Sequence, residues 1–181
     1  PERGINAVSR AMHLLSALGE KLDCHSFAAS YEKYIADDYT GGLLGCACSD
    51  KESGVLTFNP GKITLENNDV KILAGIRYPV SKKYETFATC IKAVAEKMHC
   101  ECKIIDHMSP IYFKRDDEVV VLLEKAYRDV TGDDVNQPFT VGAATFARTM
   151  PNTVAFGPIF PEQEEMSHLP NEFISIEDLN K

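Results

Sequence analysis

The sequence predicts a mixed α/β fold in two parts. Residues 1–110 are expected to form an antiparallel sheet with helices packed on it, and residues 111–181 to have β-α-β character. Two observations predict this division. In the first part, an apolar stripe at helical spacing precedes short strands separated by turn residues. In the second, a long helical pattern is followed by a strand, a tight turn with a helix, and another strand. We place the boundary near residues 109–114.

The first two elements are predicted to be helices. Over residues 5–18, apolar side chains recur every three or four positions, which places them on one helix face. The helix starts at Gly4 or at Asn6, and an asparagine is a favourable N-cap. A second helix is expected over residues 26–37, with Ser26 as its N-cap.

Three strands are predicted after a glycine-rich loop. Residues 55–58 and 63–66 are the first two, and the Asn-Pro-Gly sequence at 59–61 is expected to be the turn between them. The third strand covers residues 70–78, where apolar and polar side chains alternate. This alternation makes one face of the strand apolar and places Arg77 on the other.

The rest of the chain is predicted to alternate between helix and strand. A helix over residues 81–101 and a strand over 102–108 complete the first part. A helix over 118–132 is expected to end at its last glycine. A strand, a tight turn and a helix follow over 137–150, and then a strand and loop over 152–160. Loops at strand ends in such an arrangement commonly carry functional residues.

Charge and composition argue against several classes of partner. The formal net charge is −8, from 27 acidic and 19 basic residues, and no block of Lys and Arg occurs, so we expect no nucleic-acid partner. No apolar run reaches the roughly 18 residues that a membrane span needs, so we expect no membrane partner. Six cysteines are too few for a disulfide scaffold, and we therefore expect a protein of the reducing cytoplasm.

Two closely spaced cysteine pairs raise the question of a metal site. Cys46 and Cys48, and likewise Cys100 and Cys102, are separated by one residue, whereas zinc sites usually place two or more residues between paired cysteines. We interpret these cysteines as structural, and a thiolate metal site is the alternative. The ends of the sequence run directly into or out of helical patterns, so we expect a fragment of a longer protein.

Four stretches match, in order and approximate spacing, the motifs of one known family. They are the pattern of Pro1, Gly4, Asn6 and Ala7, the sequence AGIRYP at 74–79, the sequence VGAATFAR at 141–148, and the segment at 154–179. By these stretches the chain resembles the metallopeptidase family that includes aminoacylase, carboxypeptidase G and the carnosinase-type dipeptidases. The most similar branch is that of bacterial dipeptidase V, the Xaa-His dipeptidase-like proteins.

The resemblance implies a zinc-binding catalytic domain into which a lid domain is inserted. Residues 1–110 would be the C-terminal part of the lid, and residues 111–181 the C-terminal, incomplete part of the catalytic domain. It also implies a cytosolic enzyme that cleaves small peptides, and it favours a monomer.

The resemblance also implies a pair of zinc ions, with manganese or cobalt as alternatives. In the family these ions are bridged by an aspartate and by a water molecule that a glutamate deprotonates. His168 would bind one zinc, and the remaining ligands and the glutamate would precede Pro1. The chain alone would then be inactive and bind zinc weakly. The alternative is that His168 is an ordinary loop histidine; nearby Glu172 is expected to have a structural role.

Two further parts would bind the substrate. Arg77 would hold the C-terminal carboxylate of a dipeptide through two parallel hydrogen bonds, and the alternative is an exposed arginine on a polar strand face. Gly142, Ala143, Ala144 and Thr145 would form a turn whose N–H groups bind a carboxylate at the start of a helix, although alanines replace the family's glycines there. A plain helix start is the alternative.

Two classes of function follow from these residues. The first is a dinuclear-zinc dipeptidase, of which this chain is a part. The second is a non-catalytic ligand-binding or dimerisation module, because a sheet covered by helices serves many functions and the fold alone does not decide between them.

Overall fold

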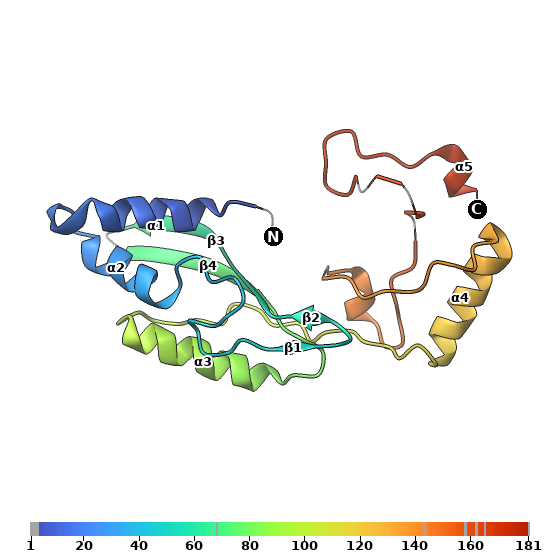
Figure 1. Ribbon diagram of the computed structural model, residues 1–181, viewed down its shortest axis with the longest axis horizontal. Coiled ribbons are helices and arrows are strands. Elements are labelled where there is room, and N and C mark those ends of the chain that lie inside the picture. The colour runs from blue at the N-terminus through green and yellow to red at the C-terminus, as the bar shows by residue number, and fades with distance from the viewer. Residues whose placement is uncertain are drawn as a thin grey trace. The chain divides into compact units, whose positions relative to one another are not determined.

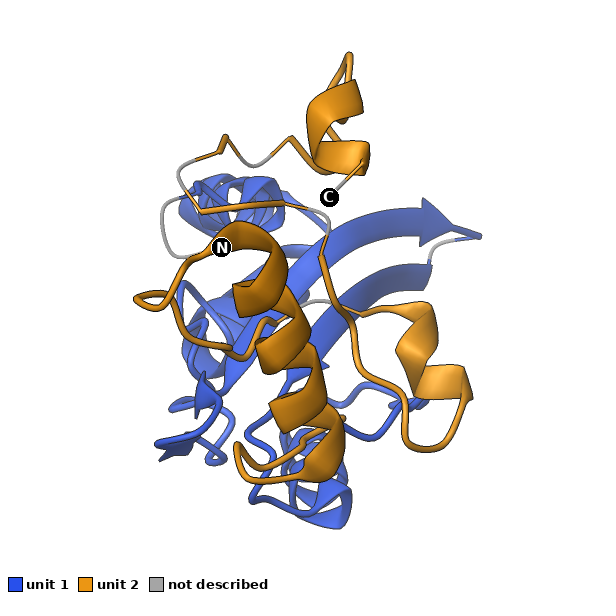
Figure 2. Ribbon diagram, turned by 90° about the vertical axis from the view of Figure 1, so that its right-hand side faces the viewer, with its two compact units in different colours: residues 1–110 blue, residues 111–181 orange. Residues whose placement is uncertain are grey.

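The chain divides into two compact units, residues 1–110 and residues 111–181 (Figure 2). The structure is a computed structural model, and it describes residues 4–67, 69–142, 144–157, 159–161, 163–164 and 166–180. Each unit is described by itself below. Among the helices of the described residues, none combines the length and the apolar character that crossing a membrane requires.

The first unit begins with helix α1, Ala7–Ala17, whose start is fixed by Asn6. The Asn6 side chain accepts a hydrogen bond of 2.9 Å from the backbone N–H of Ser9, so Asn6, and not Gly4, is the start of the helix. The Asn6 amide also donates to the side-chain oxygen of Asn59 and to the carbonyl of Pro60, each at 2.9 Å. One side chain therefore both starts the helix and ties it to a strand.

Helix α2, His25–Tyr34, follows the short 3-10 helix η1, Gly19–Lys21. The prediction that Ser26 caps α2 is wrong, because the N-cap is Cys24 and Ser26 already lies in the first turn. A capping residue needs a non-helical backbone, and that condition ends one residue before His25. The helix also ends earlier than expected, at Tyr34.

The strands form two antiparallel pairs. Strands β1, Ser49–Asp50, and β2, Gly54–Val55, make a small hairpin, and β3, Thr57–Glu66, pairs with β4, Asp69–Arg77. The fold class is therefore mixed α/β, as predicted. The strand predicted over residues 70–78 is confirmed as β4, and Arg77 is its last residue.

The Asn-Pro-Gly sequence at 59–61 is not a turn between two strands. It lies inside β3, and the register shifts between Pro60 and Lys62, which pair with Ala74 and Leu73 respectively. Gly61 is thus an extra residue in a β-bulge, where glycine and proline are tolerated because the regular ladder is interrupted. The prediction failed because a bulge and a tight turn use the same residue types.

Helix α3, Tyr84–Lys97, completes the first unit. In Figure 1, helices α1, α2 and α3 lie alongside the β3–β4 hairpin. Their apolar faces and the strands enclose a single cluster of buried side chains, which includes Val8, Met12, Ala28, Tyr31, Ile35, Leu44, Cys46, Leu56, Phe58, Phe87, Val94 and Met98. The centre of the α1 stripe is buried as predicted, whereas Ile5 and Leu18 at its ends are exposed.

Three segments predicted to be strands are irregular. The segments at 102–108, 137–141 and 152–156 belong to no strand of the described residues. A strand requires a neighbour for its backbone hydrogen bonds, and the described part of the chain supplies none for them. These strand predictions are therefore wrong for the described chain: most residues of the three segments are exposed, and none pairs with a strand.

The second unit is built around helix α4, Glu118–Thr131, which ends at Gly132 in a left-handed conformation with φ 71°. This confirms the predicted helix and its glycine stop. The 3-10 helix η2, Phe146–Thr149, and the short helix α5, Ile176–Leu179, follow. No strand occurs among the described residues of this unit.

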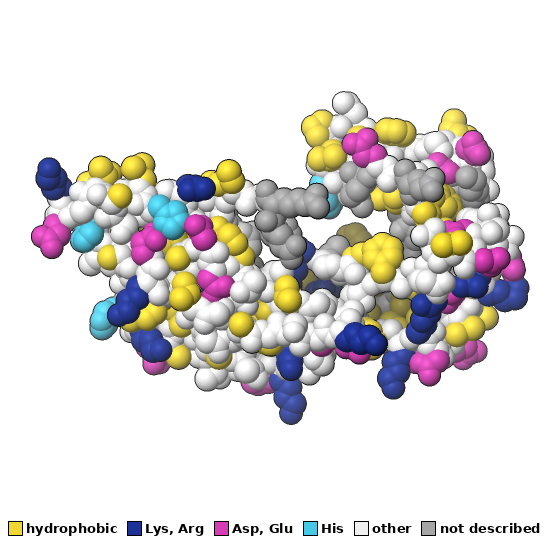
Figure 3. Space-filling model, viewed as in Figure 1, with side chains coloured by type: hydrophobic (Ala, Val, Ile, Leu, Met, Phe, Trp, Pro, Cys, Tyr) yellow, Lys and Arg dark blue, Asp and Glu magenta, His cyan; other side chains and the backbone are white. Residues whose placement is uncertain are grey.

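The second unit exposes most of its large apolar side chains. Among its described residues, Ala147 is the buried member of the apolar set, at 8% exposure. Exposed ones are spread over α4 and the loops, and Figure 3 shows several of them on the surface of this unit. They include Val121, Leu122, Val135, Phe139, Val141, Phe146, Met150, Phe156, Phe173 and Ile176. The buried core thus belongs almost entirely to the first unit.

Candidate functional site

Arg77 is the last residue of β4 and its side chain is exposed. Its strand partner is Thr57, and the preceding residue Ile76 pairs with Phe58, which is only 5% exposed. The alternation of the strand turns Ile76 toward the core and Arg77 away from it. The guanidinium is therefore available to a ligand, while the backbone that carries it is anchored in the sheet.

The residues that follow Arg77 are held against the core. The ring of Tyr78 stacks on Phe87 with 4.7 Å between the ring centroids, and Pro79 is fully buried. A hydrogen bond of 2.7 Å joins the Tyr78 hydroxyl to Nε2 of His107, and the His107 ring stacks on Tyr84 at 3.8 Å. The exit of β4 is consequently ordered by aromatic packing.

A carboxylate and a hydroxyl from the β1–β2 turn hold the same segment. One Asp50 oxygen accepts hydrogen bonds from the N–H and the hydroxyl of Ser53, at 2.6 and 2.7 Å. The Ser53 hydroxyl oxygen accepts from the Val80 N–H at 2.9 Å, and the second Asp50 oxygen accepts from the Ser81 N–H at 3.0 Å. Sequence reasoning missed this pair, although an aspartate three residues before a serine is a known local turn pattern.

These hydrogen bonds favour the ionised form of Asp50. Loss of hydration by itself raises the pKa of the carboxyl group, but the bonds from Ser53 and Ser81 outweigh it, so the pKa lies below its ordinary value. Asp50 is thus a carboxylate at neutral pH, and its bonds to N–H groups are charge-assisted.

The predicted carboxylate-binding turn lies in the second unit. Gly142, Ala144 and Thr145 are exposed, and Ala143 lies outside the described residues. Thr145 is the N-cap of η2, although its side chain makes no capping hydrogen bond. The helix expected here is a single 3-10 turn of four residues, whose dipole is smaller than that of a longer helix. Binding at this turn would therefore depend on its local N–H groups.

His168 lies in a loop made of two consecutive tight turns. The Leu169 N–H donates to the Met166 carbonyl at 3.0 Å, and the Glu172 N–H donates to the Leu169 carbonyl at 3.2 Å. His168 has a φ of 66°, and its N–H donates to a carboxylate oxygen of Glu172 at 3.1 Å. Glu172 therefore shapes the loop, in agreement with the structural role expected for it, and the His168 side chain is exposed.

The residues present supply at most a part of a metal site. Within the ranges that the structure describes, no group of three or more His, Cys, Asp or Glu side chains is arranged to hold a metal ion. His168 is thus a single donor, and one imidazole does not complete the coordination of zinc. The structure does not place these predicted residues in one element: Arg77 belongs to the first unit, whereas Gly142, Ala144, Thr145 and His168 belong to the second.

The cysteines of the first unit are free thiols. Cys46 is buried in the core, and this burial raises its pKa to about 11. Burial likewise raises the pKa of Cys100. Since the thiolate is the form that binds metal, these environments favour a packing role.

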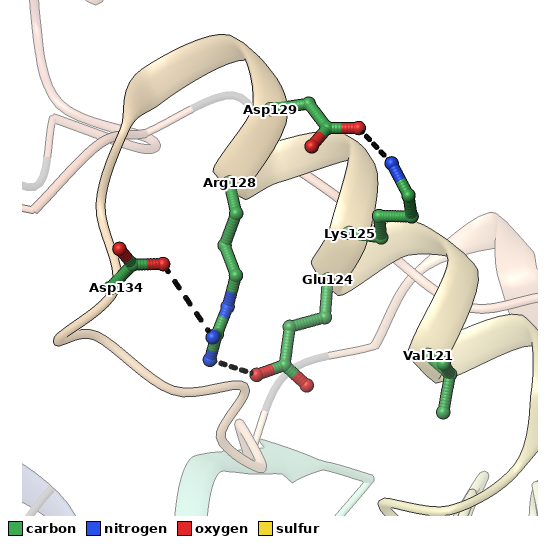
Figure 4. A pocket seen from close by; sticks show the side chains of 6 residues that line it. All are labelled: Val121, Glu124, Lys125, Arg128, Asp129 and Asp134. Carbon is green, nitrogen blue, oxygen red and sulfur yellow. Dashed lines mark hydrogen bonds and ion pairs between the residues drawn. The ribbon is translucent and has the colours of Figure 1, made fainter.

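A shallow, open groove of about 360 Å³ with a charged lining lies along α4 (Figure 4). Glu124 accepts from Arg128 at 2.5 Å and from Arg115 at 3.0 Å, and Arg128 also lies 3.7 Å from Asp134. Lys125 pairs with Asp129 on the next turn. Because these charges neutralise one another, the groove is best explained as a stabilising network of the helix and of the loop that follows it.

The match to known proteins identifies the family. The model of Peptidase family M20/M25/M40 matches residues 9–181. The chain belongs to this peptidase family. The match includes Arg77, residues 142–145 and His168, and it confirms the family resemblance that the sequence motifs indicated.

Curated relatives align with nearly the whole of this chain. A protein of Staphylococcus saprophyticus that carries the name "putative dipeptidase" is 31% identical over 99% of this chain and 38% of its own length. Proteins of the same name from Staphylococcus aureus strains MW2 and USA300 are 29% and 28% identical over the same shares. The chain thus spans 38% of the length of the relatives it matches.

Proposed function

We propose that this chain is part of a metal-dependent dipeptidase and contributes residues to its substrate and metal sites. The observation that carries the proposal is the family match over residues 9–181, together with relatives named as dipeptidases that align with 99% of the chain. Peptidases of this family are generally metal-dependent. The substrate would be a small peptide and the compartment the cytoplasm, with a monomer as the favoured state.

Arg77 would bind the C-terminal carboxylate of the dipeptide. A guanidinium offers parallel N–H donors that match the two oxygens of a carboxylate. The exposed side chain at the end of β4, on a backbone held by the sheet and by the packing of Tyr78 and Pro79, supports this role. The turn at 142–145 is proposed as a second contact for the peptide through its N–H groups, and the exposure of Gly142, Ala144 and Thr145 supports this.

His168 would provide one metal ligand, and the other ligands would come from the part of the protein that this chain does not include. The relatives' greater length leaves room for them. We propose a pair of zinc ions, with manganese or cobalt as alternatives; bound there, they would polarise the peptide carbonyl and acidify a water molecule. What this chain contributes is an imidazole presented on a loop shaped by Glu172.

The two units would be parts of different domains. The first has its own buried core, which fits the C-terminal part of a lid domain. The second exposes many large apolar side chains, and this fits a C-terminal piece of a catalytic domain that packs against the rest of that domain. The irregular segments at 137–141 and 152–156 would find their strand partners there.

A hydrolysis assay of the full-length protein tests the proposal. Dipeptides should be cleaved, chelation of the metal should abolish cleavage, and zinc should restore it. His168→Ala should lower the metal affinity by at least about tenfold, which a zinc titration measures directly. A full-length protein that binds zinc but cleaves no dipeptide would instead favour a non-catalytic binding module.

A further inference from the structure

The β1–β2 hairpin contacts the chain on both sides of Arg77. Through Leu56 it leads directly into Thr57, the strand partner of Arg77. Its turn also accepts the N–H groups of Val80 and Ser81, a few residues beyond Arg77. This short hairpin is therefore connected both to Thr57, which pairs with Arg77, and to the backbone that follows Arg77.

The segment between these two contacts has little freedom to absorb a movement. Pro79 is fully buried and its ring fixes φ, while Tyr78 is stacked on Phe87 in the core. If Val80 and Ser81 lost their acceptors, the change would reach the end of β4, since Arg77 is the last residue of the ladder. The Arg77 side chain would then leave the backbone in a different direction, and its guanidinium would be displaced.

We propose that Asp50 is a positioning residue for Arg77: together with Ser53 it sets the direction in which the guanidinium leaves β4 toward the C-terminal carboxylate of a peptide. This inference rests on the proposed role of Arg77. Bidentate binding of a carboxylate depends on orientation as well as charge, so a small displacement of the arginine has a large effect. In this proposal Asp50 acts through Arg77 and not by contact with the substrate.

The test compares two substrates in the full-length enzyme. One is a dipeptide with a free C-terminal carboxylate, and the other is the same dipeptide with a C-terminal amide. The ratio of their kcat/KM values measures recognition of the carboxylate. Asp50→Ala should lower this ratio by between about threefold and about 100-fold, the upper figure being the loss expected for a misplacement of about 1 Å. The KM of the acid should rise while kcat changes little.

Ser53 provides a second and milder variant. Ser53→Ala removes the acceptor of the Val80 N–H and should lower the same ratio, whereas Ser53→Thr keeps a hydroxyl and should retain most of it. The ratio is insensitive to the fraction of folded enzyme, because both substrates are cleaved by the same molecules. A partly unfolded Asp50→Ala preparation therefore still gives an interpretable result.

Asp38→Ala is the matched control. The Asp38 carboxylate also accepts backbone N–H groups in a turn of the first unit, from Thr40 at 3.1 Å and Leu43 at 2.5 Å, and it holds neither Val80 nor Ser81. Its loss should lower the activity on the acid and on the amide equally. If Asp38→Ala lowered the acid-to-amide ratio as much as Asp50→Ala does, any weakened turn would have this effect. That result would overturn the role assigned to Asp50.

Arg77→Ala distinguishes a failure of the proposed role of Arg77 from a failure of the proposed role of Asp50. If the wild type does not prefer the acid, or if Arg77→Ala leaves the preference intact, the proposed role of Arg77 is wrong. If Arg77→Ala removes the preference while Asp50→Ala and Ser53→Ala retain it, only the positioning role fails. In the Arg77→Ala background, Asp50→Ala should cause no further loss of the ratio, because the residue that it positions is gone.

Discussion

At the scale of residues, a buried pair of hydroxyl groups links the first two helices. Ser9 is fully buried on α1, and its hydroxyl shares a hydrogen bond of 2.9 Å with the Tyr31 hydroxyl and donates to the Ala36 carbonyl at 3.0 Å. A buried hydroxyl that loses its partner costs more free energy than a bond between two matched groups contributes. The pairing of α1 with α2 therefore depends on this contact.

A double-mutant cycle tests the Ser9–Tyr31 contact. Ser9→Ala should lower the free energy of unfolding by about 1–3 kcal/mol, because it leaves the Tyr31 hydroxyl buried without this partner. Adding Tyr31→Phe should cost less in the Ser9→Ala background than in the wild type. Urea denaturation measures all four states. Strictly additive losses would show that the two hydroxyls do not stabilise one another.

His13 makes the stability of the first unit depend on pH. Its Nε2 lies 2.9 Å from Asp37 and its Nδ1 lies 2.6 Å from Glu32. The hydrogen bond to Asp37 is the main cause that raises the pKa of His13 above 6.5; burial opposes it and Glu32 adds to it. A raised pKa stabilises the folded state below pH 6.5, and this contribution is lost as the pH rises through the folded-state pKa.

We therefore expect His13→Gln to lower the Tm more at a pH below 6.5 than at a pH above the folded-state pKa of His13, where the wild-type imidazole has lost its proton. Thermal unfolding at the two pH values measures the difference. An equal loss of Tm at both values would mean that the protonated ring contributes nothing.

At the scale of elements, the helices were easier to predict than the strands. The stripe around Val8 and Met12, the cap at Asn6 and the stop at Gly132 are local signals, and the structure contains each of them. Strands depend on partners that are distant in sequence, so the segment at 102–108 could not be decided from its own pattern. For the candidate site, motif likeness indicated Arg77 and the other two parts, but their mutual arrangement is not encoded in local pattern.

Two glycines with the same φ allow the cost of backbone strain to be measured apart from the cost of steric crowding. Gly41 and Gly54 both have φ +82°, yet a Cβ on Gly41 would lie 2.9 Å from a Leu56 methyl carbon, whereas nothing lies within 4 Å at Gly54. Gly54→Ala should cost about 1–2 kcal/mol from the left-handed backbone alone. Gly41→Ala should cost about 1–3 kcal/mol more, because Leu56 is fully buried and cannot move freely.

Urea denaturation of the two alanine variants measures this difference directly. Equal losses would mean that the core around Leu56 relaxes at no cost. An unchanged stability in Gly54→Ala would show that the start of β2 adopts another backbone conformation.

At the scale of the whole molecule, the two units differ in how they are stabilised. The apolar cluster of the first unit is assembled from three helices and a hairpin, whereas the described residues of the second contribute little buried apolar surface. The first unit should therefore resist unfolding more than the second when the chain is studied alone. Proteolysis of the chain should remove α4 and the loops around His168 before it cuts α1.

The metal affinity of the chain alone follows from its single proposed ligand. Calorimetric titration with zinc should show only weak binding, because one imidazole does not form a complete site. Full-length protein should bind much more tightly, and His168→Ala should reduce that affinity. Tight stoichiometric binding by the chain alone would contradict the proposal and direct attention to the cysteines.

The bulge in β3 has a consequence for how the protein avoids self-association. At Pro60 the strand has no N–H to offer, and its carbonyl is already occupied by the amide of Asn6. A polypeptide that approached to extend the sheet at this residue would find no N–H donor, and it would have to share the carbonyl with Asn6. The Asn6 side chain, which caps α1, thus also helps to protect the β3 edge at Pro60 from amyloid-like pairing with another chain.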